Sequence, residues 1–138
     1  MKTKIKLFVL LASISLLSCN EGLTGIKGSG NITTEKRNST APFTAIDAST
    51  GVTVIVAQDS SASIAVETDD NIQQYITTKI ENSTLYIKVE GNINTQSPIN
   101  INVTMPSISG LDASSGSTIR SRNTLKGTSL SLVTSSGA

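Results

Sequence analysis

Two aspartates stand at matching places in a repeated motif, and their types and spacing come closest to those of a catalytic pair. Asp47 lies in the hexapeptide IDASTG and Asp112 in the hexapeptide LDASSG. Two carboxylates about 5–10 Å apart serve glycoside hydrolysis as acid and as nucleophile or base. A third copy, LVTSSG, carries Val133 at that place, so the repeat does not require an acid there. The pattern therefore favours aspartates that point outward beside turns and accept hydrogen bonds from backbone amides.

The densest group of oxygen ligands is Asp69-Asp70-Asn71, with Glu67 close by in the sequence. A Ca²⁺ ion takes six to eight oxygens, and this group offers about half of them without the spacing of an EF-hand loop. A turn is the better interpretation, with Asp70 as the N-cap of a short helical turn that runs to Tyr75. No metal site is therefore predicted.

The basic residues Arg120, Arg122 and Lys126 lie close together in the last part of the chain. Polysaccharide lyases of the β-helix type use a basic residue together with acidic Ca²⁺ ligands. No acidic cluster accompanies these three side chains in the sequence. A solvated strand face is therefore the favoured interpretation.

The composition excludes several classes of protein. The chain of 138 residues has no His, no Trp and one Cys, and 3% of its residues are aromatic. His-based acid–base catalysis, nucleophile–His systems and the common zinc sites therefore lack the residues they need. Aromatic platforms for single-stranded nucleic acid are excluded in the same way. We predict that the protein is not an enzyme, has no catalytic residues and uses no cofactor.

The N-terminal residues 1–18 are predicted to be a lipoprotein signal peptide. An apolar stretch from Ile5 to Leu17 follows a lysine-rich start and is too short for a membrane span of about 20 residues. Its end, Leu-Leu-Ser-Cys, resembles a bacterial lipobox, which implies cleavage before Cys19 and attachment of fatty acids such as palmitate. Asn20 after the cysteine favours the outer membrane, at its periplasmic face or at the cell surface. A plain secretory signal that leaves a free thiol is the alternative.

The charge of the mature chain argues against nucleic acid as a partner. The signal peptide contains three of the eleven basic residues, so eight basic residues remain against ten acidic ones. A nearly neutral, mildly acidic domain has no electrostatic attraction to nucleic acid or to anionic lipid. The predicted partners are the membrane, through the N-terminal lipid, and a glycan or envelope polymer.

The rest of the chain divides into a tether and a β domain. Residues 19–34 are rich in Gly, Ser, Thr and Asn and are predicted to be a flexible lipid-anchored tether that leads into a first strand. Residues 35–138 alternate apolar and polar side chains with period two, which is typical of strands. The clearest of these segments are Phe43–Ala48, Val52–Val56, Ser63–Thr68, Tyr75–Ile80, Leu85–Val89 and Ile99–Met105. The residues 81–84 are predicted to be the turn of an antiparallel hairpin.

The three copies of the hexapeptide predict the fold. They occupy residues 46–51, 111–116 and 132–137, and the last two are 21 residues apart. A β-rich repeat near 20 residues with Ser-Gly corners is typical of solenoid coils, in which small side chains let layers stack about 4.8 Å apart. The sequence therefore predicts an all-β, β-solenoid fold, a single-stranded β-helix-like stack with an initial antiparallel hairpin region.

The chain resembles the bacterial family called "putative auto-transporter adhesin, head GIN domain" in five segments: Gly28–Glu35, Phe43–Val54, Val66–Ile72, Leu85–Ile87 and Ile108–Ser117. The resemblance implies an all-β fold with a β-helix-like stack, a lipoprotein or secreted context and a role in adhesion, and it brings no catalytic residues. The chain stops directly after the third repeat. We therefore expect the domain 35–138 to be truncated at its C-terminus and its last repeat to pair with another chain or fray.

These inferences predict a lipid-anchored cell-envelope protein, an adhesin whose β-solenoid surface binds an extended polymer or surface ligand. Faces rich in Ser, Thr and Asn offer many weak hydrogen bonds, which suits avidity. The ligand-binding residues are not predicted. Two alternatives stay open: a carbohydrate-active enzyme of the β-helix type, and a structural envelope module that self-associates through its C-terminal repeat.

Overall fold

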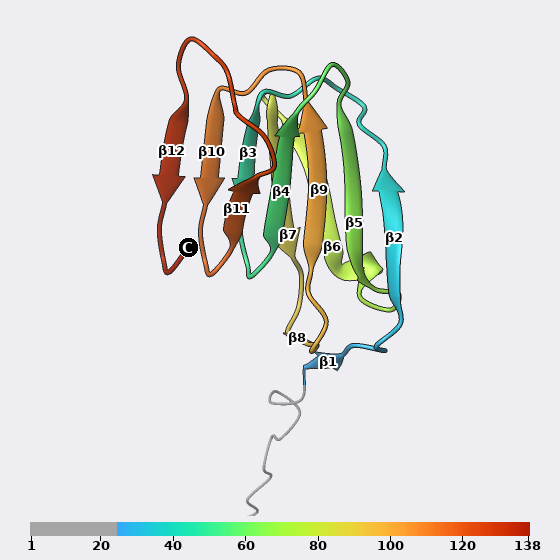
Figure 1. The fold of residues 1–138 in the computed structure, drawn as a ribbon. Helices are drawn as coiled ribbons and strands as arrows, with labels where there is room; N and C mark the ends of the chain where they lie inside the picture. Colours follow the sequence, from blue (N-terminus) through green and yellow to red (C-terminus); the bar gives the residue numbers. More distant parts are fainter. Residues whose placement is uncertain (1–24) are drawn as a thin grey trace, which may run out of the picture.

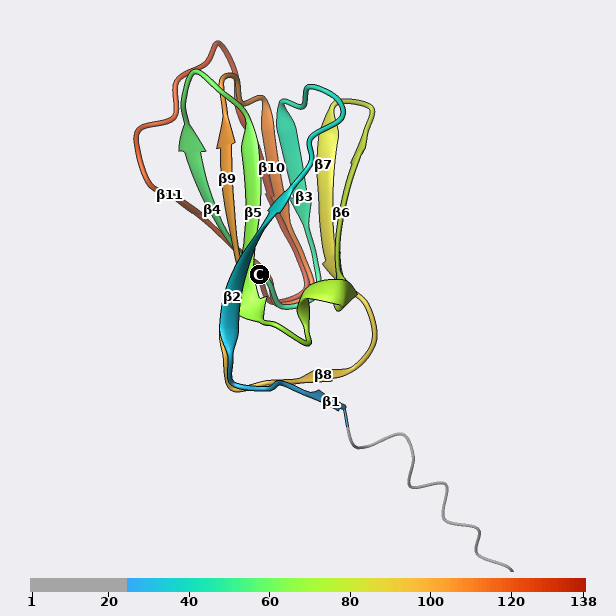
Figure 2. The ribbon, with the colours of Figure 1, turned by 90° about the vertical axis from the view of Figure 1, so that its right-hand side faces the viewer.

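The computed structural model describes residues 25–138, which fold into two layers of β-sheet (Figures 1 and 2). The elements in chain order are β1 (Ile26–Lys27), β2 (Ile32–Arg37), β3 (Ala45–Ala48), β4 (Thr53–Gln58), β5 (Ser63–Asp69), the 3₁₀ turn η1 (Gln73–Tyr75), β6 (Ile76–Glu81), β7 (Thr84–Val89), β8 (Ile93–Asn94), β9 (Asn100–Met105), β10 (Gly110–Ala113), β11 (Thr118–Ser121) and β12 (Ser131–Thr134). The described residues form no helix long and apolar enough to cross a membrane.

Each layer is a mixed five-stranded sheet. The first sheet has the order β12-β10-β3-β7-β6, and the second has the order β11-β4-β9-β5-β2. Four strands of the first sheet and three of the second run parallel to their neighbours, whereas β6, β5 and β2 pair antiparallel. The short strands β1 and β8 form a separate parallel pair below the two layers (Figure 1).

The apolar core lies between the two sheets because the strands alternate as their sequences predict. In β9, for example, Ile101, Val103 and Met105 are buried, while the intervening Asn and Thr side chains face outward. Successive side chains of a strand point to opposite faces, so one apolar face per strand suffices to fill the space between the layers. The buried set draws on both sheets and includes Ile46, Val54, Val66, Leu85, Ile87 and Leu111.

The all-β prediction is confirmed, but the β-solenoid prediction is wrong. A solenoid places its strands in successive parallel coils, whereas here both sheets are mixed and β2, β5 and β6 pair antiparallel with their neighbours. One reversal contributes to the difference: only residues 59–62 separate β4 from β5, and β5 runs back antiparallel beside β9, so the chain does not continue a coil there. The three repeats nevertheless lie in one sheet, with Ile46, Leu111 and Leu132 in register on β3, β10 and β12.

The Ser-Gly and Thr-Gly pairs of the repeat form turns with left-handed backbone. Thr50, Ser115 and Ser136 have φ between 52° and 69°, and the glycine that follows each of them has φ between 72° and 78°. Glycine adopts this conformation without steric cost, which explains why it closes every copy. In the first two copies the turn leads the chain from the first sheet to the second, from β3 to β4 and from β10 to β11.

The hairpin predicted at residues 81–84 is present. β6 and β7 pair antiparallel, and the two residues between them, Asn82 and Ser83, have φ of 49° and 60°. Two consecutive left-handed residues are the signature of a type I′ turn, whose twist matches that of the flanking strands.

Residues 25–34, which the sequence assigns to the tether, take part in the fold. Ile26 and Lys27 pair with Ile93 and Asn94, and β2 begins at Ile32 and pairs with β5 along its whole length. The remainder of the predicted tether, residues 19–24, lies outside the described residues, as does the predicted signal peptide.

Candidate functional site

Five side chains stand in one row across the outer face of the first sheet. The strand register places neighbours of this row directly beside one another, in the order Lys79 (β6), Tyr86 (β7), Asp47 (β3), Asp112 (β10) and Val133 (β12). The residues before and after Asp47 and Asp112 in their strands point into the core, so both carboxylates face outward. We call these five residues the outer row.

Two shallow hollows flank Tyr86 in the outer row. One, of about 240 Å³, lies over β3 and β10 and has the two aspartates between Tyr86 and Val133, with the small residues Ala45 and Gly110 beside them. The other, of about 300 Å³, lies over β6 and β7 and is lined by Thr77, Lys79, Glu81, Tyr86 and Lys88. Neither exceeds the lower end of the range of roughly 300–1,000 Å³ that is usual for small-molecule sites, so the row offers a shallow track across the sheet.

The two aspartates of the outer row repel one another. Partial burial raises the pKa of Asp47, and the negative charge of Asp112 raises it further. Like charges directly opposite on neighbouring strands destabilise a sheet. Within residues 25–138 neither carboxylate forms an ion pair, and the two lysines of the neighbouring hollow bind glutamates, Lys79 with Glu81 at 2.6 Å and Lys88 with Glu90 at 3.2 Å. The hollow over β3 and β10 is therefore acidic and rich in hydrogen-bond acceptors.

The structure corrects the expectation that the aspartates stand beside turns and accept backbone hydrogen bonds. Asp47 is the third residue of β3 and Asp112 the third residue of β10, so each lies inside a strand. No donor among the described residues reaches either carboxylate. The repeat puts the two acids side by side because the copies pair in register, with Val133 of the third copy next in line.

The acidic segment Asp69-Asp70-Asn71 fastens the N-terminal residues to the domain. Asp69 is fully buried and accepts hydrogen bonds from Thr95 Oγ1, from Ser97 Oγ (2.7 Å) and from the backbone amide of Gly30 (3.1 Å). The hydroxyls of Thr95 and Ser97 hold the pKa of Asp69 below its usual value. We call the segment Asp69-Asp70-Asn71 the clasp. Its role is structural, because the Asp69 carboxylate already accepts hydrogen bonds from donors of the protein itself.

Asp70, the second aspartate of this clasp, binds Ser29 and Asn31. Asp70 accepts hydrogen bonds from Ser29 Oγ at 2.5 Å and from Asn31 Nδ2 at 2.9 Å, and these bonds lower its pKa. The prediction that Asp70 caps a helical turn is wrong, because η1 begins after Ile72 and has no side-chain cap. Among the described residues, no group of three or more acidic, His or Cys side chains is placed to hold a metal ion.

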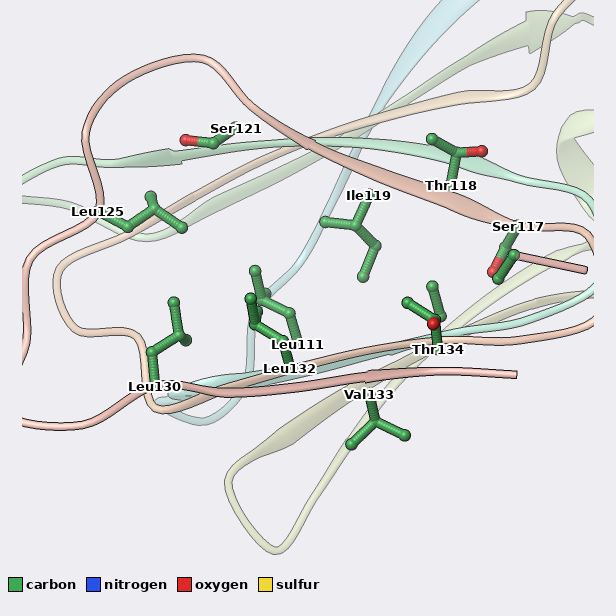
Figure 3. A pocket seen from close by; sticks show the side chains of 12 residues that line it. Leu111, Ser117, Thr118, Ile119, Ser121, Leu125, Leu130, Leu132, Val133 and Thr134 are labelled. Atoms are coloured by element: carbon green, nitrogen blue, oxygen red, sulfur yellow. The ribbon is translucent and has the colours of Figure 1, made fainter.

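An apolar groove of about 350 Å³ opens at the end of the molecule where β11 and β12 lie (Figure 3). Five aliphatic side chains converge on it from both sheets and the loop between them, namely Leu111, Ile119, Leu125, Leu130 and Leu132. Leu132 is 67% exposed although its neighbours in register, Ile46 and Leu111, are buried. The sequence does not predict this groove, because an inward-facing leucine of an edge strand has the same pattern as one in the core.

A family model for the "putative auto-transporter adhesin, head GIN domain" matches residues 42–138. The chain belongs to this head GIN family. The match begins just before β3 and includes every strand that contributes to the outer row. None of the curated proteins is similar enough to this chain to count as a match.

Solved structures share the fold of this head GIN domain. A putative adhesin from Parabacteroides merdae has a TM-score of 0.70 at 22% identity over 79% of this chain and 46% of its own length. A putative adhesin from Bacteroides fragilis has a TM-score of 0.70 at 19% identity, over 80% and 54%. A putative lipid binding protein from Parabacteroides distasonis has a TM-score of 0.56 at 16% identity, over 70% and 43%. The chain thus spans about half the length of these proteins, and the likeness concerns the fold alone.

The remaining residues singled out by the sequence lie apart from the outer row of the head GIN domain. Arg120 is on β11 of the second sheet, and Arg122 Nη2 donates a hydrogen bond to Asn102 Oδ1 on the same side of the molecule (2.9 Å). These cations therefore do not join the two aspartates in one site. Cys19, the predicted lipid attachment residue, lies outside the described residues.

Proposed function

We propose that this head GIN protein is a lipid-anchored cell-envelope adhesin that binds neutral polysaccharide along the outer row. The observation that carries the proposal is the alignment of Tyr86, Asp47 and Asp112 in register across three neighbouring parallel strands. Family membership and the adhesin names of two structural neighbours support an adhesive role. The lipobox-like end of the signal peptide supports anchoring through Cys19.

The chemistry of the outer row suits a chain of sugar rings. Ionised carboxylates only accept hydrogen bonds, and sugar hydroxyls are abundant donors. The ring of Tyr86 is 39% exposed and provides an apolar surface between the two hollows for the C–H face of a sugar. Two unpaired carboxylates disfavour an acidic polymer, so a neutral polymer is the better ligand.

The shallow geometry of the track favours binding by many weak contacts. Each hollow accommodates a small part of a polymer, and a long polymer can engage many anchored copies at once. Such multivalent contacts raise the overall avidity far above the affinity of one site. This is how a domain without an enclosed pocket holds an extended ligand.

Binding of the full chain to immobilised dextran, mannan and xylan tests the role of the outer row. We expect retention on at least one of these polymers, and a loss of affinity of about tenfold or more in Tyr86→Ala and in the double variant Asp47→Asn/Asp112→Asn. Glu67→Gln is the matched control, because Glu67 is an outward-facing acid on the second sheet. Equal affinity of the wild type and both outer-row variants, or no retention of the wild type, would refute the proposal.

A second candidate, glycoside hydrolysis, rests on the raised pKa of Asp47 beside the charge of Asp112. A raised pKa is what a general acid needs, and a neighbouring carboxylate is what it works with. Release of reducing ends from the same polymers distinguishes hydrolysis from binding. If hydrolysis occurs and Asp47→Asn abolishes it, the protein is a glycoside hydrolase and the hypothesis that it only binds polysaccharide is wrong.

The anchor is tested separately from the binding face. Two or more acyl chains hold a protein durably on a membrane. We expect Cys19→Ala to move the protein from the membrane fraction to the soluble fraction, while Ser39→Ala, a control in an exposed loop of the domain, stays with the membrane. Retention of Cys19→Ala in the membrane fraction would contradict lipid anchoring and leave the polysaccharide proposal unaffected.

A further inference from the structure

The outer row crosses paired strands of the first sheet and takes one side chain from each of them. The register places four of its members on neighbouring strands, namely Lys79 (β6), Tyr86 (β7), Asp47 (β3) and Asp112 (β10), and Figure 2 shows these strands side by side. Neighbouring strands of a sheet lie about 4.7–4.9 Å apart. The row therefore presents a new side chain at every step of that length.

One flank of the outer row is low, because small residues stand beside the two aspartates. Ala45 and Gly110 precede Asp47 and Asp112 by two positions, so they face outward on the same strands and are themselves paired in register. Thr84 of β7 pairs with Ala45 and continues this flank. The hollow of about 240 Å³ over β3 and β10 lies above these small residues. A flat chain can therefore lie along the row in contact with both carboxylates.

We propose that the polysaccharide of the proposed function, on which this inference rests, is an extended β-1,4-linked chain that crosses the strands with one sugar ring per strand. A β-1,4-linked pyranose chain is a flat ribbon, and each ring advances it by nearly the spacing of two strands in a sheet. An α-1,4-linked chain of the same sugar coils, and an α-1,6-linked chain is flexible. Neither of them keeps its rings in step with the strands.

The side chains of the row match the two kinds of surface on such a ribbon. Hydroxyl groups project from the edges of the ribbon, whereas its faces carry C–H groups. The half-exposed ring of Tyr86 provides an apolar surface for one face. The carboxylates of Asp47 and Asp112, which form no ion pair within residues 25–138, accept hydrogen bonds from hydroxyls at an edge. Lys79 has further N–H donors beside the one that Glu81 binds.

Binding of the full chain in detergent to pentasaccharides immobilised on a surface tests the linkage. Cellopentaose, xylopentaose and mannopentaose provide the β-1,4 linkage, and maltopentaose and isomaltopentaose provide the α linkages. Cellopentaose and maltopentaose are a matched pair, because they contain the same sugar and differ only in the configuration of the linkage. We expect the best β-1,4-linked ligand to bind about tenfold or more tightly than either α-linked ligand, which corresponds to one or two hydrogen bonds of the row.

Two variants at separate strands of the row test the direction of the chain. Lys79→Ala and Asp112→Asn should each weaken binding of the best pentasaccharide by about threefold to tenfold, because only a chain that crosses the strands contacts both residues. Lys36→Ala is the matched control, since Lys36 is an exposed lysine on β2 of the second sheet, and it should leave the affinity unchanged. Circular dichroism checks that each variant keeps its sheets.

The outcomes separate this inference from the proposed function. Equal affinity for the α-linked and β-linked pentasaccharides, with loss of binding in Tyr86→Ala, would overturn the extended ribbon and leave the polysaccharide proposal standing. An effect of only one of the two variants would overturn the crossing direction, because the ligand would then follow a single strand. Binding to none of the pentasaccharides would overturn the inference as well, and retention on whole polymers then decides on the proposed function.

Discussion

Thr68 provides a sharp test of how this core is packed, because its hydroxyl is buried without a partner. Thr68 lies on β5 and is fully buried, and its Oγ1 has no hydrogen-bond partner among the described residues. Its side chain alternates in phase with Ile64 and Val66, which point into the core. Replacement by Val keeps the β-branched shape and removes the unsatisfied hydroxyl.

The expected gain follows from the cost of burying an unpaired polar group. A buried donor or acceptor that loses its partner costs about 1–3 kcal/mol. We therefore expect Thr68→Val to raise the free energy of unfolding by about 1 kcal/mol, which corresponds to about 4–8 °C in Tm for a domain of about 100 residues. Thr68→Ser keeps the hydroxyl and deletes a methyl group, and it should lower the free energy of unfolding by about 1 kcal/mol.

Thermal unfolding followed by circular dichroism, together with urea titration, measures both effects. Thr34→Val is the control, since Thr34 is exposed on β2 and its replacement should change the free energy of unfolding by less than about 0.5 kcal/mol. A lower Tm for Thr68→Val than for the wild type would show that the hydroxyl is satisfied in the folded protein, and the reasoning about this part of the core would fail.

Three further predictions concern the clasp and the outer row. Gly28→Ala should lower the urea midpoint, because a Cβ there would stand 1.9 Å from Asp69 Oδ2; an unchanged midpoint would mean that the carboxylate is free to move. The hydrogen bond from Thr95 is the main reason that the pKa of Asp69 lies below 3.8. The ionised carboxylate therefore stabilises the folded protein fully above pH 3.8, and this stabilisation is lost as the pH falls through the pKa of the folded state. Asp69→Asn should make the free energy of unfolding depend less steeply on pH in this acidic range. The pKa of Asp47 is raised from 3.8, so its ionised carboxylate destabilises the folded protein above the pKa of the folded state. Asp47→Asn should therefore raise the free energy of unfolding at pH 7 by about 0.2–1 kcal/mol, near the low end because the pair of aspartates is solvated. Asp59→Asn, an exposed control, should leave the free energy of unfolding unchanged in the same titration.

The local features of the fold follow from the sequence because they depend on neighbouring residues. The two-residue alternation of Ile99–Met105 predicts a strand with one buried face, and β9 has it. The turn between β6 and β7 is predicted from Asn82 and Ser83, and it is present. The repeat predicts corners, and its Ser-Gly and Thr-Gly pairs are indeed left-handed turns.

The predictions that are wrong concern the pairing of strands and contacts between residues far apart in the sequence. The repeat predicts a solenoid, but alternation is the same for a strand with parallel neighbours and for one with antiparallel neighbours, so the sequence does not predict the antiparallel pairing of β2 and β5. Asp70 was expected to cap a helical turn, yet it binds Ser29 and Asn31, which lie about forty positions earlier in the chain. Nothing in the immediate sequence of Asp70 identifies such distant donors.

The sequence by itself therefore determines the all-β class, the turns and the side of each strand that faces the core, since all of these arise from the period of two and from backbone preferences. The candidate site is a product of the tertiary structure alone. Lys79, Tyr86, Asp47 and Asp112 form a row only because four strands pair in one register, and that register is chosen by the burial of their opposite faces between the two sheets. The open groove has the same origin, because a leucine becomes exposed or buried according to whether another strand lies beside it.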